Sequence, residues 1–255
     1  MITVYSFGDS FAEGHCQEVD NGISPSCKLF ADSKKYHYDK NGLAGCTNLD
    51  ISGQILNKIG KIKKDDYVIV YQTSYDRWNY PCIVNEDYFR FVPTELISKM
   101  KVSNVLQNIN YYDYLYPMNS ATPWVNDNKE YHNFEYEILS NDERELVKDY
   151  YFKVFHTYHD SYKNYTNSFF YSAINSLRDV CNNVIVLGTE LWFGMDEYIK
   201  DYYNNPNVKI YCECKHWSQE THFFVSKLLE NYFETKEQNK WIDSNNIERI
   251  YKKIE

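Results

Sequence analysis

Four short segments rich in β-branched and aromatic residues constrain the fold of this 255-residue chain more than any other feature. They are residues 2–7 (ITVYSF), 65–74 (DDYVIVYQTS), 182–191 (NNVIVLGTEL) and 207–213 (NVKIYCE). Short apolar runs of this kind are typical of strands that are buried on both faces. Because stretches with helical spacing separate them, the pattern favours a parallel sheet with helices packed on both sides.

The expected fold is a three-layer α/β/α sandwich with a flavodoxin-like parallel sheet of five strands, the second of them ending near residues 41–48. Helices are expected at residues 25–33, 49–59, 141–158 and 167–181, and from Ser218 onward. Ser24 is expected to cap the first of these helices and Ser218 the last. No linker-like composition divides the chain. We therefore expect one domain over residues 1–255, with an aromatic-rich insertion at about 78–142, between the third and fourth strands, and a charged helical extension at about 236–255.

The charge and cysteine pattern exclude several classes of protein. The formal net charge is −9, and no basic stripe is present that would follow a nucleic-acid backbone. No run approaches the ~18 apolar residues of a membrane span. The N-terminus lacks a signal-peptide pattern, so a cytoplasmic location is expected, or a virion-associated one if a phage encodes the protein. Seven scattered cysteines favour a reduced compartment, and no cofactor or metal is expected.

Polar residues follow the strands at the edge where functional groups gather in parallel sheets. Ser10 follows the first strand, after Gly8 and Asp9, and His216 follows the last, three residues after Glu213. A serine hydroxyl becomes a nucleophile when a base removes its proton, and a carboxylate can orient that base. Two structural readings remain open: Asp9 and Ser10 could simply form a strand-to-helix turn, and His216 could be a surface histidine.

These motifs resemble the sequence blocks of the SGNH (GDSL-type) hydrolases. YSFGDSF resembles the first block, with Ser10 in the nucleophile position, and ECKHWSQETH resembles the last, with Glu213 and His216 in the positions of the acid and base. LAGCTNLDI resembles the second block and places Gly45 where a backbone N–H helps to form the oxyanion hole. The resemblance implies ester hydrolysis through an acyl-serine, with Ser10, Gly45 and Asn48 holding the oxyanion. His222, inside the final helix, is expected to be packed or hydrogen-bonded.

The third block departs from the family pattern. It normally supplies an asparagine to the oxyanion hole, whereas this chain has YQTSYDRWNY and resembles a divergent subgroup with a W-T/S-S-x-x-R stretch. Losing one such donor typically costs about a hundred- to a thousandfold in rate. Asn48 could replace the missing amide, or Thr73, Ser74 or Arg77 could do so. The residues expected to contact substrate are Asp9, Thr73, Ser74, Arg77 and Trp78, although Arg77 could instead be a surface ion-pair partner.

The aromatic content bears on the substrate. Aromatic residues make up 18% of the chain, with 26 tyrosines, many of them between residues 71 and 171. Tyrosine and tryptophan faces suit sugar rings, so an O-acyl (acetyl) group on a carbohydrate or a small ester is the expected substrate. Biased codon usage in an AT-rich genome is the alternative explanation of the same composition. The alternatives are a non-catalytic glycan-binding or structural module on the same scaffold and an O-acyltransferase.

Overall fold

The structure is a computed structural model that describes residues 1–14, 23–42, 46–73, 159–192, 194–213, 216–235 and 241–243. The chain divides into two units, which are described separately. The first consists of Met1–Ala44, Lys58–Thr73 and Ile174–Glu255, and it contains the whole sheet. The second consists of Gly45–Asn57 and Ser74–Ala173.

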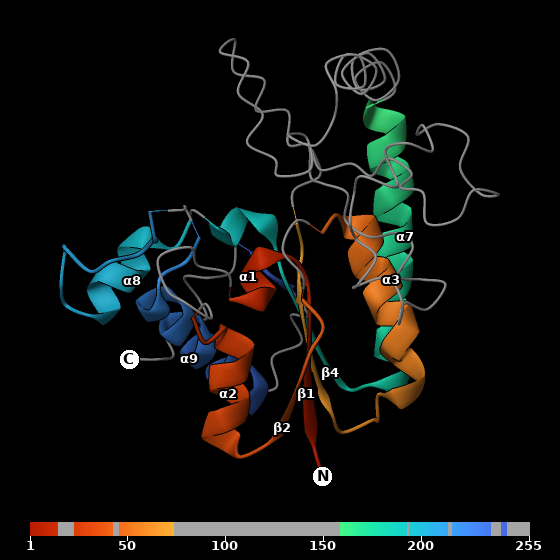
Figure 1. Cartoon of the computed structure of the whole chain (residues 1–255), viewed down its shortest axis with the longest axis horizontal. Coiled ribbons are helices and arrows are strands. Elements are labelled where there is room, and N and C mark those ends of the chain that lie inside the picture. Colours follow the sequence, from red (N-terminus) through yellow and green to blue (C-terminus); the bar gives the residue numbers. More distant parts are fainter. Residues whose placement is uncertain are drawn as a thin grey trace, which may run out of the picture. The chain divides into compact units, whose positions relative to one another are not determined.

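A parallel sheet forms the centre of the first unit (Figure 1). Its strands are β1 (Thr3–Phe7), β2 (His37–Lys40), β3 (Tyr67–Tyr71), β4 (Asn183–Leu187) and the two-residue β5 (Trp241–Ile242). They lie side by side in the order β2-β1-β3-β4-β5, and every neighbouring pair is parallel. The expectation of an α/β fold with a parallel sheet is therefore confirmed. The same strand order occurs in flavodoxin-like sheets.

The fifth predicted strand is wrong. Residues 207–213 do not join the sheet, and Tyr211 makes only an isolated antiparallel bridge with Trp217. The reason lies in the alternation of this segment, in which Lys209 and Glu213 are exposed while Ile210 and Cys212 are buried. Such a pattern suits a ribbon covered on one side, not a strand covered on both. The short β5 instead pairs with β4, within the stretch that was predicted to be helical.

Apolar side chains are buried on both faces of the sheet. Val4, Ile69 and Ile185 belong to the main core cluster, which also contains residues of α2 (Ser26–Lys34), α8 (Asp196–Tyr202) and α9 (Gln219–Thr235). Side chains alternate along a strand, and the intervening residues Phe7, Val68, Val70, Val184 and Val186 are buried as well. Strands β1, β3 and β4 are thus covered on both sides, as their apolar runs predicted, whereas β2 is only partly buried. The complete three-layer arrangement stays a prediction.

The remaining helices of the described chain are α1 (Ser10–Glu13), α3 (Asn48–Lys58), η1 (Ile59–Lys61), α7 (His159–Val180) and η5 (Thr189–Trp192). The helix predicted at 49–59 is confirmed as α3. The helix predicted at 167–181 is confirmed as α7, which begins earlier, at His159. The predicted insertion at about 78–142, the predicted helix at 141–158 and most of the predicted extension lie outside the described residues.

The first turn of α9 holds the start of α2. Pro25 is the N-cap residue of α2 and offers no side-chain acceptor, so the predicted cap at Ser24 is wrong. The N–H of Ser26 instead donates to Nδ1 of His222, at 3.1 Å. The Gln219 side chain accepts from the N–H of Ser24 at 3.0 Å and donates to its carbonyl at 3.2 Å. His222 is packed and hydrogen-bonded, as expected.

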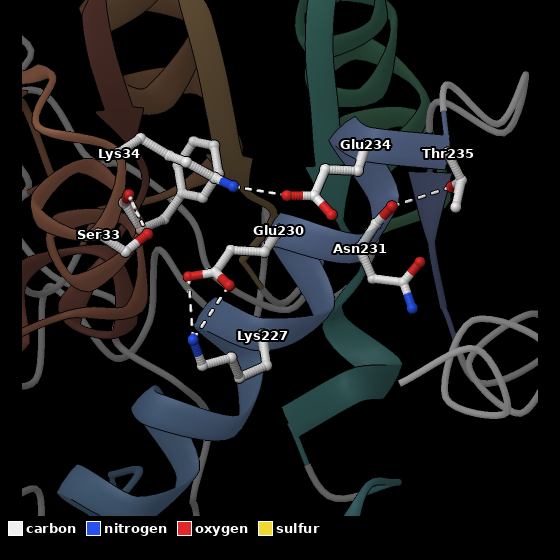
Figure 2. Close-up of polar contacts among 8 residues, drawn as sticks. Ser33, Lys34, Lys227, Glu230, Asn231, Glu234 and Thr235 are labelled. Carbon is white, nitrogen blue, oxygen red and sulfur yellow. Dashed lines mark hydrogen bonds and ion pairs between the residues drawn. The ribbon is translucent and has the colours of Figure 1, made fainter. Parts of the chain in front are cut away.

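The other ends of the same two helices meet through charged side chains. Lys34 at the end of α2 forms an ion pair with Glu234 near the end of α9, and Lys227 pairs with Glu230 within α9 (Figure 2). Because these pairs lie at the surface, water screens them and they add little to stability. The buried hydrogen bond between Ser26 and His222 therefore contributes more to the attachment between the helices than the ion pairs do.

Burial keeps His222 neutral. Desolvation and, to a smaller extent, the neighbouring His216 lower its pKa to about 3. Only the neutral ring can accept the Ser26 N–H at Nδ1, because both nitrogens of an imidazolium are donors. The bond between α9 and α2 is therefore available at neutral pH and is lost if the ring becomes protonated.

The His222 ring should make the stability of the protein fall in mild acid. Its unfolded pKa is near 6.5, so above that pH neither state binds a proton there and the full stability is present. As the pH falls from 6.5 toward 3, only the unfolded state gains the proton, which should cost about 2 kcal/mol at pH 5. Urea unfolding at pH 7.5 and pH 5 measures this loss. The variant His222→Gln should lose less between the two pH values, and an equal loss in both proteins would contradict the prediction.

Candidate active site

Gly8 lets the chain turn sharply from β1 into α1. Its φ is +150°, a backbone conformation that residues with side chains rarely adopt. A Cβ at this position would lie 2.7 Å from Cβ of Tyr71 and 2.8 Å from Cβ of Ala12. The Ser10 turn is thus pressed directly against the end of β3, and no larger residue fits at position 8.

Asp9 fixes the start of α1. It is the N-cap residue, and its Oδ1 accepts from the N–H of Phe11 at 3.1 Å. Its Oδ2 accepts from the hydroxyl of Thr73 at 2.8 Å, and both side chains are fully buried. Ser10 is the first residue of α1 and is almost fully buried. Asp9 therefore has the capping role at this turn, and Ser10 does not.

His216 lies in a short hairpin that precedes α9. The hairpin is closed by the N–H of Ser218, which donates to the carbonyl of Ile210 at 2.9 Å, and by the N–H of Cys212, which donates to the carbonyl of His216 at 2.8 Å. The hydroxyl of Ser218 accepts from the N–H of Thr221 at 3.2 Å. Ser218 caps α9 through this bond, as predicted, and the hairpin enters the helix in a fixed orientation.

Trp217 anchors this hairpin in the core. Only 1% of its surface is exposed, and its ring packs edge-on against Phe11 with centroids 4.9 Å apart. It also contacts the rings of Tyr71, at 6.2 Å, and His222, at 5.4 Å. Sequence reasoning identified His216 and overlooked Trp217, because its anchoring role depends on ring contacts with residues distant in the sequence.

The structure brings His216 to the turn that carries Ser10. Its imidazole lies against the ring of Phe11, with centroids 5.4 Å apart and the planes tilted by 49°. Phe11 directly follows Ser10 in α1, so opposite ends of the sequence meet within the first unit. Glu213 is exposed at the turn of the same hairpin. The contact that joins His216 to this turn is with the Phe11 ring, whereas general-base catalysis requires the imidazole within hydrogen-bond reach of the Ser10 hydroxyl.

The remaining predicted site residues are distributed differently. Asn48 is buried at the start of α3, in the second unit, where its carbonyl accepts from the hydroxyl of Ser52 at 2.8 Å. The residues Gly45, Ser74, Arg77 and Trp78 lie outside the described part of the chain.

The start of α3 is capped reciprocally by Thr47 and Asp50. The N–H of Thr47 donates to Oδ2 of Asp50 at 2.8 Å, and the N–H of Asp50 donates to Oγ1 of Thr47 at 3.2 Å. Sequence analysis did not identify this pair, although its spacing is that of a capping box.

The described residues include neither a metal-binding cluster nor a membrane-spanning helix. They contain no cluster of three or more histidine, cysteine or acidic side chains that could hold a metal ion. None of their helices is both long enough and apolar enough to cross a membrane.

Comparisons with known proteins give no relative for this chain. No protein-family model matches the sequence, and no curated protein and no solved structure matches it significantly.

Trp217→Ala should lower the free energy of unfolding by about 3–5 kcal/mol, because it removes a large side chain from a close-packed site. Trp217→Phe keeps part of the packing and should lose less. Phe223→Ala is the control, since Phe223 lies in α9 with 40% of its surface exposed and should lose at most about 1 kcal/mol. Denaturant unfolding measures all three variants, and equal losses at positions 217 and 223 would contradict the anchoring role.

Proposed function

We propose that this protein is a serine ester hydrolase of the SGNH type, with Ser10 as nucleophile and His216 as general base and acid. One observation carries the proposal: the His216 imidazole packs on Phe11, the residue next to Ser10. The carboxyl ends of the strands are the edge at which parallel α/β sheets place their functional groups, and the Ser10 turn follows β1 there.

In the proposed reaction, His216 removes the proton from the Ser10 hydroxyl as the oxygen attacks the ester carbonyl. The resulting tetrahedral intermediate carries a negative oxygen. When it collapses, the imidazolium gives its proton to the leaving alcohol, and the acyl group remains on Ser10. A water molecule, deprotonated by the same imidazole, then attacks the carbonyl of the acyl-serine. The bond between this carbonyl and Ser10 Oγ breaks, the imidazolium returns the proton to the serine oxygen, and the acyl group leaves as a carboxylic acid.

The proposed oxyanion hole begins with the backbone N–H of Ser10. This group belongs to the first turn of α1, where N–H groups have no acceptor within the helix. The N–H of Gly45 and the side-chain amide of Asn48 are the proposed further donors, by their positions in the second sequence block. Glu213 is the proposed partner that orients His216, because it belongs to the same closed hairpin.

The proposed substrate is an O-acyl ester of a carbohydrate or a small acyl ester. This part of the proposal depends on the aromatic composition between residues 71 and 171, much of which lies outside the described residues. Short acyl esters of p-nitrophenol are the appropriate first probes, since they test the reaction without assuming a particular sugar. Addition of a glycan acceptor then distinguishes hydrolysis from acyl transfer by the product formed.

Replacement of the nucleophile tests the reaction directly. Ser10→Ala should reduce the hydrolysis of p-nitrophenyl acetate by at least about a thousandfold, to the level without enzyme, because no acyl-serine can form. Ser33→Ala is the matched control, since Ser33 is exposed on α2, and it should hydrolyse the ester at the wild-type rate. Equal rates in wild type and Ser10→Ala would dismiss the mechanism, and inactivity of the wild-type protein would favour a non-catalytic binding module.

Substitutions of His216, the proposed base, and Glu213, its proposed partner, should lower kcat by different amounts. His216→Ala should lower kcat by about a thousandfold or more, whereas His37→Ala, at an exposed histidine of β2, should leave it unchanged. Glu213→Gln should lower kcat by at least about tenfold, because the amide cannot stabilise an imidazolium as a carboxylate does. Glu220→Gln, at an exposed residue in the first turn of α9, is the control for that substitution. Wild-type activity in Glu213→Gln would remove Glu213 from the mechanism.

A further inference from the structure

We propose that Asp9 and Thr73 form a positioning pair that locks the Ser10 turn onto the end of β3. This inference rests on the proposed function, since its purpose is to hold the nucleophile in place. It departs from the expectation that both residues contact the substrate. It also assigns Thr73 a role other than replacement of the oxyanion-hole asparagine that the third block lacks.

The contacts of Asp9 join two neighbouring strand ends. One carboxylate oxygen accepts from the N–H of Phe11, and the other accepts from the hydroxyl of Thr73, so the carboxylate bridges α1 and the residues after β3. Ser10 lies between Asp9 and Phe11, and its backbone is therefore held on both sides. The close approach of Gly8 to Tyr71 adds a steric contact between the same two segments.

Burial makes this pair strongly dependent on its own hydrogen bonds. Asp9 and Thr73 are both 0% exposed, so water does not replace a lost partner. A buried carboxylate without its donors is costly, and the side chain would turn away to find others. Because the same carboxylate caps α1, such a movement would shift the backbone that carries Ser10.

The bond to Asp9 also limits what Thr73 can do for the reaction. A hydroxyl has a single proton to donate, and Thr73 donates it to Oδ2 of Asp9 at 2.8 Å. The same proton is not available to an oxyanion. Thr73 is therefore a positioning residue and not the donor that replaces the missing asparagine amide.

Two substitutions at position 73 separate the hydrogen bond from the volume of the side chain. Thr73→Val keeps the shape and removes the donor, and Thr73→Ser keeps the donor and removes a methyl group. Thr73→Val should lower kcat for p-nitrophenyl acetate by roughly ten- to a hundredfold, because a small displacement of a nucleophile is costly, while KM changes less than about twofold. Thr73→Ser should keep kcat within about threefold of wild type. Thr166→Val is the matched control, since Thr166 is also buried and donates its hydroxyl proton within α7.

Hydrogen–deuterium exchange supplies a second readout that does not require activity. The backbone amide hydrogens of residues 8–14 should exchange faster in Thr73→Val than in wild type. In Thr73→Ser and Thr166→Val they should exchange at the wild-type rate. If wild type is active and Thr73→Val matches it in both kcat and exchange, the positioning role is overturned while the proposed function stands. If wild type is inactive, the proposed function fails, and the exchange rates alone decide whether the pair holds the turn.

Discussion

The packing of Trp217 against Phe11 is the contact on which the arrangement of the site depends. Phe11 belongs to the helix that begins at Ser10, and Trp217 follows His216, so one buried aromatic pair sets the position of both proposed catalytic groups. Aromatic pairs of this size and geometry add to the energy of burying their surface. The contact is also apolar, so it retains its strength in salt, unlike the surface ion pairs between α2 and α9.

The first turn of α9 extends the same attachment to a third segment. Ser218 caps the helix, Gln219 holds the backbone of Ser24, and His222 accepts the N–H of Ser26 at the start of α2. The hairpin of His216 is therefore continuous with a helix that is bonded to the core at several points. The imidazole proposed as the base is thus attached to a well-supported helix, which limits the conformational entropy that a reaction at this site would cost.

The elements predicted best were those whose apolar residues recur with a regular period. Strands β1, β3 and β4 and helices α3 and α9 were recognised from their apolar spacing, because burial imposes a period on them. The strand at 207–213 was predicted wrongly because one-sided burial in a hairpin also produces alternating apolar residues. The short β5 escaped notice because two residues carry no periodic signal. The contacts of Trp217, His222 and Thr73 were not predictable, since they join residues that only the tertiary fold brings together.

The caps of α1 and α9 are provided by residues other than Ser10 and His216. A serine or aspartate after a strand often serves only to begin a helix, and that reading fits Asp9, which caps α1. Ser218 caps α9, and His222 satisfies the first N–H of α2. These three residues perform the structural work that Ser10 and His216 would otherwise be expected to do at such turns. The roles proposed for Ser10 and His216 therefore leave the caps of these helices unchanged, since Ser10 is nearly buried outside the cap of α1 and the His216 ring packs on Phe11 beside it.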